Sequence, residues 1–234
     1  MKQNKQNISI IIPVLNEADC IGKLIGYLKQ NYTSNYIEEI IIVDGGSTDN
    51  TIAIASANGV TVITSEKGRA KQLNRGAACA KSSILYFLHA DTFPPKNFGN
   101  SIINAVEKGN QVGCFQMKFD SDSRFLNFFA WFSKWNYKIC RGGDQSLFIT
   151  KDLFLKTNGF NERYMIYEDN EFISRLYKTS HFTVLPLHVK TSARKYEEKG
   201  KFRLQYHFGI IHLKKYLGAS PEKLYDYYKR NIAV

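Results

Sequence analysis

Three acidic side chains follow apolar runs in the N-terminal half of the sequence. Short runs of branched apolar residues that end in a polar group are typical of buried parallel strands. The carboxyl ends of such strands form the ligand-binding edge of an open α/β sheet, so we expect the three acids at one edge. Grouped carboxylates there suit a nucleotide and a divalent cation. The acids are Glu17, Asp44 and Asp91, after runs at residues 8–15, 40–43 and 84–88.

A second acidic pair, Glu168 and Asp169, stands at the expected start of a helix. A hydroxyl that attacks a donor must lose its proton, and a carboxylate can accept it. The N-terminus of a helix favours the ionised form of such side chains. The pair therefore contains a candidate general base, with ordinary first-turn helix acids as the alternative.

The elements that must position these acids alternate between strand and helix over the first 110 residues. This alternation predicts βαβ units and a parallel sheet, hence the α/β class. In the second half we expect a half-exposed strand at 113–119, an aromatic helix at 125–140, a flexible loop at 141–145 and a helix at 168–178. The aromatic helix either packs in the core or contacts a membrane. The expected early helices span residues 18–30, 48–58, 69–80 and 95–109, and a short strand spans 60–63.

Five ordered segments, which together span about residues 8–180, closely resemble glycosyltransferase family 2. The first two follow the expected first and second strands, and the third opens a helix. The fourth stands where the family keeps its Asp-x-Asp metal motif, and the fifth ends in its Glu-Asp base motif. The segments are 10–17, 42–51, 68–77, 87–91, and 159–162 with 167–169.

This resemblance implies a GT-A-type, Rossmann-like three-layer sandwich with a mostly parallel central sheet and a C-terminal helical extension. The transferase domain would span 1–190 and a basic amphipathic extension 191–234. The implied reaction is inverting transfer from a UDP- or GDP-linked sugar to a hydroxyl, assisted by Mg²⁺ or Mn²⁺. Asp91 would hold the metal, Asp169 would be the base, and Glu168 would orient the acceptor. The donor would be lined by Pro13, Asn16, Glu17, Asp44, Gly45, Arg69, Asn74, His89 and Ala90.

Two positions depart from the family pattern. Gly45 replaces a second aspartate, which removes one contact to the base, and His89 replaces the first aspartate of the metal motif. A neutral His89 could still bind Mn²⁺ or could be structural, and Asp44 could cap the following helix. The departures leave a rival hypothesis, a degenerate nucleotide-sugar or lipid-binding protein without turnover. The segments also resemble a compact bacterial subgroup associated with arsenosugar biosynthesis.

Composition limits the partners. The 234 residues carry a formal charge of +11, and residues 190–234 hold eleven Lys or Arg against four acids. Such a basic segment attracts anionic lipid or phosphorylated substrates. Nucleic acid ranks last, because an acidic sheet edge repels phosphate when no metal ion is bound. The acceptor is a small molecule or lipid-linked, and we leave peripheral membrane contact open.

Other features of the sequence bear on location. No apolar run is long enough to cross a bilayer, and the polar N-terminus predicts no signal peptide. We therefore expect a cytoplasmic protein, with attachment to the inner membrane face left open. The four cysteines are too scattered for a zinc site or a disulfide framework, and we expect them reduced and mostly buried.

Overall fold

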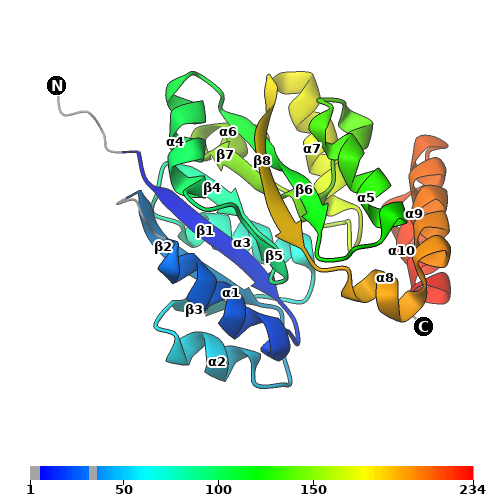
Figure 1. The fold of residues 1–234 in the computed structure, drawn as a ribbon, viewed down its shortest axis with the longest axis horizontal. Coiled ribbons are helices and arrows are strands. Elements are labelled where there is room, and N and C mark those ends of the chain that lie inside the picture. The colour runs from blue at the N-terminus through cyan, green and yellow to red at the C-terminus, as the bar shows by residue number, and fades with distance from the viewer. Residues whose placement is uncertain (1–5, 32–35, 234) are drawn as a thin grey trace.

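The computed structural model describes residues 6–31 and 36–233. They form one curled, eight-stranded sheet covered by helices on both faces (Figure 1). The segment from which no signal peptide is expected, residues 1–5, lies outside this described part. In spatial order the strands are β3 (Thr61–Thr64), β2 (Ile37–Asp44), β1 (Ile8–Val14), β4 (Ile84–Phe87), β7 (Leu147–Thr150), β6 (Val112–Phe119), β8 (Phe182–Thr191) and β5 (Thr92–Phe93).

The predicted parallel sheet is confirmed for its first half. Strands β3, β2, β1 and β4 are parallel neighbours. The second half is mixed, because β7 is antiparallel to both β4 and β6, and β5 is antiparallel to β8, whereas β6 and β8 are parallel. The carboxyl ends of β1 and β2 therefore open on the same edge, as the positions of Glu17 and Asp44 require.

Two cores, one on each face of the sheet, create three layers. Successive side chains of a strand point to opposite faces, so Ile10 and Ile12 join one core and Ile11 joins the other. The first core packs beneath α1 (Ala18–Gln30), α2 (Thr51–Ala57) and α4 (Phe98–Glu107). The second packs beneath α3 (Arg69–Cys79), α6 (Lys151–Lys156) and α7 (Glu168–Thr179).

Helix α3 lies unusually close to the sheet. A Cβ added at Gly76 would lie 2.4 Å from Cγ2 of Ile11 and 2.9 Å from Cγ2 of Val43. Only glycine permits this approach. The close packing fixes the N-terminal end of α3, and with it Arg69, at the carboxyl edge of the strands.

The predicted helix at 125–140 is wrong. Helix α5 (Arg124–Trp131) ends early, and two 3₁₀ turns follow, η1 (Phe132–Lys134) and η2 (Lys138–Cys140). The chain leaves the helix because Ser133 is tied to the sheet, where its Oγ accepts from the backbone N–H of Met117 at 2.9 Å. The loop expected to be flexible contains a third turn, η3 (Gly143–Gln145). The expectation of mostly buried cysteines also fails, since only Cys114 is buried.

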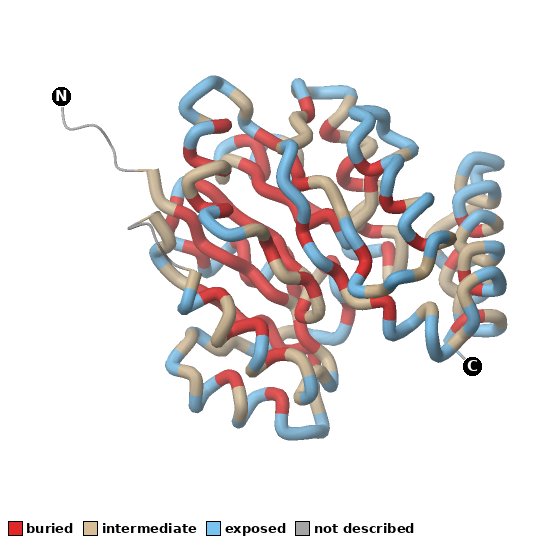
Figure 2. The backbone as a smooth tube through the Cα atoms, in the orientation of Figure 1, coloured by how far each residue is buried: buried red, intermediate tan, exposed pale blue. Residues whose placement is uncertain are grey.

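The C-terminal residues form helices α8 (Arg194–Lys199), α9 (Lys201–Tyr216) and α10 (Pro221–Asn231). Leu204, Ile211 and Leu224 pack with Tyr164, so this bundle lies against the loop that precedes α7. Its outer face is largely exposed (Figure 2). Among the described helices, none combines the length and the apolar character needed to span a membrane. The division at residue 190 stays a prediction.

Candidate active site

The loops that follow β1 and β2 are joined by side-chain hydrogen bonds. The backbone N–H of Asn16 donates to Oγ of Ser47 at 2.9 Å, and Oδ1 of Asn16 accepts from the N–H of Thr48 at 2.8 Å. The N–H of Glu17 donates to Oγ1 of Thr51 at 2.8 Å. Asn16 adopts a left-handed conformation, with φ of 55°, which turns the chain sharply after β1. The predicted meeting of these two strand ends is confirmed.

Asp44 is buried, and its carboxylate is used within its own turn. Oδ2 accepts from the N–H of Gly46 at 2.9 Å and from that of Ser47 at 3.0 Å. It does not cap the following helix, whose first residue, Thr51, donates its N–H to Asp49 instead. Asp44 therefore shapes the turn at the sheet edge, and its contact with a nucleoside stays a prediction.

Gln72 explains the glycine at position 45. Its buried Nε2 donates to the carbonyl oxygens of Val14 and Val43, each at 2.8 Å, and so clamps β1 to β2 at their carboxyl ends. A Cβ on Gly45 would lie 2.9 Å from Cδ of Gln72. The space that a second aspartate would need is thus already filled. The sequence carried no signal for this clamp beyond the missing aspartate.

Arg69, on α3, forms ion pairs with both residues of the acidic pair, Glu168 and Asp169. As the first residue of α3, it places Nε 3.2 Å from Oε1 of Glu168 and Nη1 3.5 Å from Oδ2 of Asp169. Glu168 is 1% exposed. Burial raises the pKa of Glu168 to about 7, although the charge of Arg69 opposes this. Residues predicted from separate motifs are therefore brought together.

His89 lies between two carboxylates. Its Nδ1 is 3.3 Å from Oδ1 of Asp144, and its Nε2 is 3.6 Å from Oδ2 of Asp169. Burial favours the neutral ring, but the two carboxylates outweigh burial and raise the pKa of His89 to about 10. The imidazolium has no lone pair for a metal ion. The structure therefore favours His89 as a partner of Asp169 over the metal-ligand alternative.

Asp169 is held in its ionised form. Its burial raises the pKa, but the contact with His89 and the charge of Arg69 more than compensate, and the pKa falls below its ordinary value. Asp169 can therefore accept a proton at neutral pH. Glu168, with its raised pKa, is the weaker candidate for a base that must start out ionised.

The turn at Gly143 and Asp144 completes the site, and it is anchored by a buried arginine. Arg141 is 4% exposed and donates to Oε1 of Gln145 at 2.8 Å and to the carbonyl of Ser133 at 2.6 Å. This anchoring corrects the expected flexible loop. The sequence signal that could have revealed it is a glycine pair directly before an acid.

Asp91, the predicted metal ligand, has no strong partner for its carboxylate among the described residues. Hydroxyl Oγ1 of Thr92 is 3.5 Å from its Oδ1, and within the described part of the chain its carboxylate makes no ion pair. The described residues hold no cluster of three His, Cys, Asp or Glu side chains suited to a metal. The donor set fits a hard divalent cation that takes its remaining ligands from phosphate oxygens and water. Pro13, half-buried, lies in β1, and Ala90, buried, directly precedes Asp91 in the chain.

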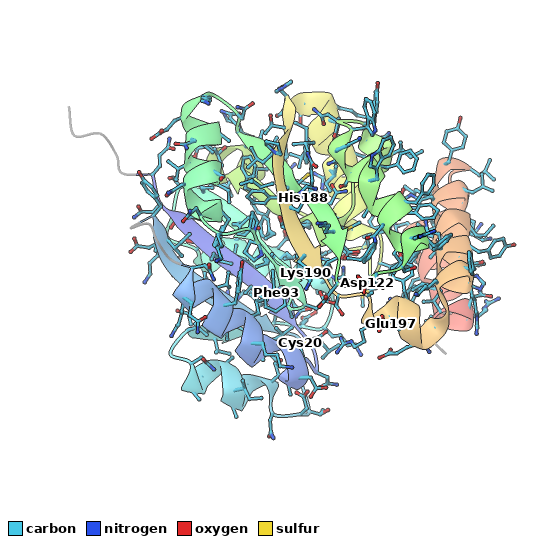
Figure 3. All side chains as sticks on the ribbon, in the orientation of Figure 1. Cys20, Phe93, Asp122, His188, Lys190 and Glu197 are labelled. Atoms are coloured by element: carbon cyan, nitrogen blue, oxygen red, sulfur yellow. The ribbon has the colours of Figure 1, made fainter. Side chains whose placement is uncertain are left out.

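The sequence favours an exposed surface position for Arg194 over a contact with the diphosphate, yet Arg194 reaches Glu17 at the carboxyl end of β1. Its Nη2 is 3.2 Å from Oε2 of Glu17, and its Nη1 is 3.7 Å from Sγ of Cys20. Figure 3 shows Cys20 near the start of α1, below Lys190 at the end of β8, the strand that leads to Arg194. Burial raises the pKa of Glu17, while Arg194 opposes that rise. Arg194 therefore places a positive charge beside Glu17 and within electrostatic reach of Asp91.

The side-chain amide of Asn74 forms hydrogen bonds within the protein. Its Nδ2 donates to the carbonyl of Phe160 at 2.9 Å and to Oε1 of Glu162 at 2.8 Å, and its Oδ1 accepts from the N–H of Phe160 at 2.9 Å. These bonds hold the loop before α7 against α3. Both N–H groups of the Asn74 amide are therefore engaged within the protein, and the contact of Asn74 with a nucleotide stays a prediction.

Comparison with known proteins agrees with this geometry. A sequence model of the family described as Glycosyl transferase family 2 matches residues 9–183. Glucosyl-3-phosphoglycerate synthase of Mycolicibacterium paratuberculosis is 30% identical over 99 residues, 38% of this chain and 30% of that protein. Glycosyltransferase GlyG of Streptococcus pneumoniae is 29% identical over 129 residues, 50% of this chain and 42% of that protein. The chain thus spans less than half the length of these relatives.

Solved structures share the fold. S. aureus TarS 1–349 in complex with UDP-GlcNAc superposes with a TM-score of 0.65 at 19% identity, covering 80% of this chain and 58% of that one. Mycobacterium tuberculosis glucosyl-3-phosphoglycerate synthase, in complex with Mn²⁺, UDP and glucosyl-3-phosphoglycerate, superposes with a TM-score of 0.59 at 17% identity, covering 78% and 70%. The predicted GT-A-type fold is confirmed.

Proposed function

Because the chain belongs to glycosyltransferase family 2, we propose that it transfers a hexose from a UDP- or GDP-linked sugar to an acceptor hydroxyl with inversion. The observation that carries the proposal is Asp169, a buried carboxylate kept ionised between His89 and Arg69. Solved relatives with UDP or UDP-GlcNAc bound support a uridine donor.

In the proposed step, Asp169 accepts the proton of the acceptor hydroxyl as that oxygen bonds to the anomeric carbon. The bond from this carbon to the diphosphate breaks on the opposite side, and its electron pair leaves with the diphosphate oxygen. One such displacement inverts the anomeric centre. Glu168 beside it orients the acceptor, and Arg69 fixes the distance between the two acids.

The donor side of the proposal uses the strand edge. Asp91 would hold Mg²⁺ or Mn²⁺, which would stabilise the charge of the departing diphosphate. Complexes of glucosyl-3-phosphoglycerate synthase with either ion support this choice. Among the proposed donor-lining residues, Asp44 and Asn74 would contribute indirectly, because their side chains hold nearby backbone in place. The full set remains Pro13, Asn16, Glu17, Asp44, Gly45, Arg69, Asn74, His89 and Ala90.

The acceptor and the location of the protein are part of the proposal. We propose a small or lipid-linked acceptor and a cytoplasmic location, with contact at the inner membrane face. Membership of the subgroup associated with arsenosugar biosynthesis is supported by the sequence segments alone.

The test is release of UDP or GDP from a panel of nucleotide sugars, with water as the slow acceptor, in Mn²⁺ and in EDTA. We expect metal-dependent release from one donor, and a loss of roughly 100-fold or more in Asp169→Asn, the scale of general-base catalysis. The exposed acid Asp152 on α6, changed to Asn, is the matched control. A protein that binds nucleotide but releases nothing would be the degenerate binder instead.

A further inference from the structure

Aromatic side chains are exposed on the segment that precedes the turn at Gly143 and Asp144. Phe128 is 58% exposed, Trp131 49% and Trp135 46%. Single exposed apolar residues are ordinary, but a contiguous apolar patch on a protein surface marks an interaction site. The sequence left open whether these residues enter the core, and the structure places these three outside it.

The exposed rings form a connected surface that reaches the C-terminal bundle. Ring centroids of Phe128 and Phe129 are 5.6 Å apart, and those of Phe129 and Phe125 are 5.0 Å apart. Phe125 in turn lies 4.5 Å from Phe202, the second residue of α9. The contact between Phe125 and Phe202 therefore joins α5 and α9, which stand next to each other at one side of the molecule (Figure 1), into one face.

Helix α9 has two apolar sides. Leu204 and Ile211 point into the C-terminal bundle. Phe202, Tyr206, Leu213 and Tyr216 recur at helical spacing on the other side and are 74%, 65%, 52% and 88% exposed. Only the inner side is covered, and the outer side extends the aromatic surface of α5.

The two segments that carry this surface are basic. Residues 123–140 contain three Lys or Arg and no Asp or Glu, and residues 199–221 contain five and none. Lys134 places Nζ 3.7 Å from the ring centroid of Trp131. Aromatic rings mixed with lysines are typical of surfaces that lie at the headgroup level of a membrane. A second copy of the chain would bring lysine against lysine and is disfavoured by the same charges.

We propose that the surface formed by Phe128, Trp131, Trp135, Phe202, Leu213 and Tyr216 binds an anionic lipid bilayer. The exposed segment 134–139 leads directly into the turn where Gly143 and Asp144 meet Asp169 and His89. Bound in this way, the enzyme would present its acceptor side near the lipid headgroups. That consequence, and a lipid-linked acceptor with it, rests on the proposed transferase activity, whereas bilayer binding does not.

The two tryptophans of the chain are Trp131 and Trp135, so fluorescence excited selectively in tryptophan reports on this surface alone. The full chain is mixed with vesicles of phosphatidylglycerol and phosphatidylcholine, or of phosphatidylcholine only. We expect a blue shift with the anionic vesicles that weakens as salt is added. No shift, or an equal shift with neutral vesicles, overturns the proposal.

Variants that keep both tryptophans sharpen the test. Lys134→Glu with Lys138→Glu should weaken binding to anionic vesicles at least tenfold, because each lysine near such a surface contributes about 1 kcal/mol. Lys23→Glu with Lys108→Glu makes the same charge change on exposed positions of α1 and the end of α4 and should have little effect. Equal loss in both pairs would contradict a defined surface.

Apolar variants give a second, independent readout. Phe202→Ser with Tyr216→Ser should release the protein from vesicles in a flotation assay, whereas Leu155→Ser, at a residue 62% exposed on α6, should not. A wild-type dimer that these changes dissociate, without vesicle binding, would assign the surface to a second copy. UDP binding measured in parallel separates failure here from failure of the proposed function.

Discussion

The Cβ atom that Gly143 lacks would lie 2.0 Å from Oδ2 of Asp169. The same Cβ would lie 2.9 Å from Cε1 of His89. The turn that carries Asp144 therefore contacts Asp169, the proposed base, through the backbone of a glycine. This contact explains why a glycine stands there, and it makes the position of Asp169 depend on a residue with no side chain.

Gly143→Ala should displace the Asp169 carboxylate and lower the rate of sugar transfer roughly 100-fold, the scale expected for a catalytic group moved by about 1 Å. Affinity for nucleoside diphosphate should fall less than the rate, since the Cβ meets Asp169 most closely. Initial rates and calorimetric titration with UDP measure the two effects. Gly142→Ala is the control, because nothing lies within 4 Å of a Cβ at that position. Equal activity of the two variants would contradict the role of Gly143.

Gly45→Asp restores the aspartate that most of the family carries, but here it should destabilise the fold. The added Cβ meets the buried Gln72 side chain at 2.9 Å, and overpacking typically costs about 1–3 kcal/mol. Gln72→Ala alone should also destabilise, because it frees two buried carbonyls.

Urea denaturation of the single and double variants measures their coupling. We expect the double variant to lose less than the sum of the two single losses, since Gln72→Ala opens space for the aspartate. Strict additivity would show that Gln72 does not determine the glycine.

The elements of the N-terminal half of the chain could be predicted because each follows from a local sequence pattern. Largely apolar runs marked β1, β2 and β4, and the polar residues after them marked the edge. The segment at 125–140 was predicted wrongly for the same reason. Its aromatic pattern is that of a helix, but the bond of Ser133 to β6 ends the helix early.

The parts of the site that the sequence could not reveal depend on contacts between distant residues. Gln72 acts through two backbone carbonyls, and Arg194 reaches Glu17 across 177 positions. Neither has a local pattern that distinguishes it from a surface residue. His89 could be flagged as a departure, but its placement between Asp144 and Asp169 required the fold.

His89→Asp restores the first aspartate of the family's metal motif and should impair the proposed sugar transfer. It would place a third carboxylate beside Asp144 and Asp169, and like charges raise the pKa of a carboxyl group. The acid limb of the pH–rate profile should therefore move upward by about one unit. His89→Gln, which is neutral, should move it less. Wild-type rates and an unchanged profile in His89→Asp would disprove the pairing.

Glu168 should make the protein less stable as pH rises. Burial raises the pKa of Glu168 to about 7 from an ordinary 4.5, so the folded state retains a proton that the unfolded state has lost. The stabilising contribution is full below pH 4.5 and is lost as pH rises through 7.

Glu168→Gln cannot ionise, so its free energy of unfolding should fall less between these pH values, by on the order of 2 kcal/mol. Urea titrations of both proteins across that range test this. Parallel curves would show that the environment of Glu168 does not disfavour its charge.

The most direct measurement is calorimetric titration of UDP and GDP into the wild-type protein and Asp91→Ala, each in Mn²⁺ and in EDTA. One nucleotide should bind the wild type in Mn²⁺, and its affinity should fall at least tenfold in EDTA and in Asp91→Ala alike. Binding that is the same in all four conditions, or no binding of either nucleotide to the folded wild type, would contradict a metal-assisted nucleotide-sugar site at Asp91.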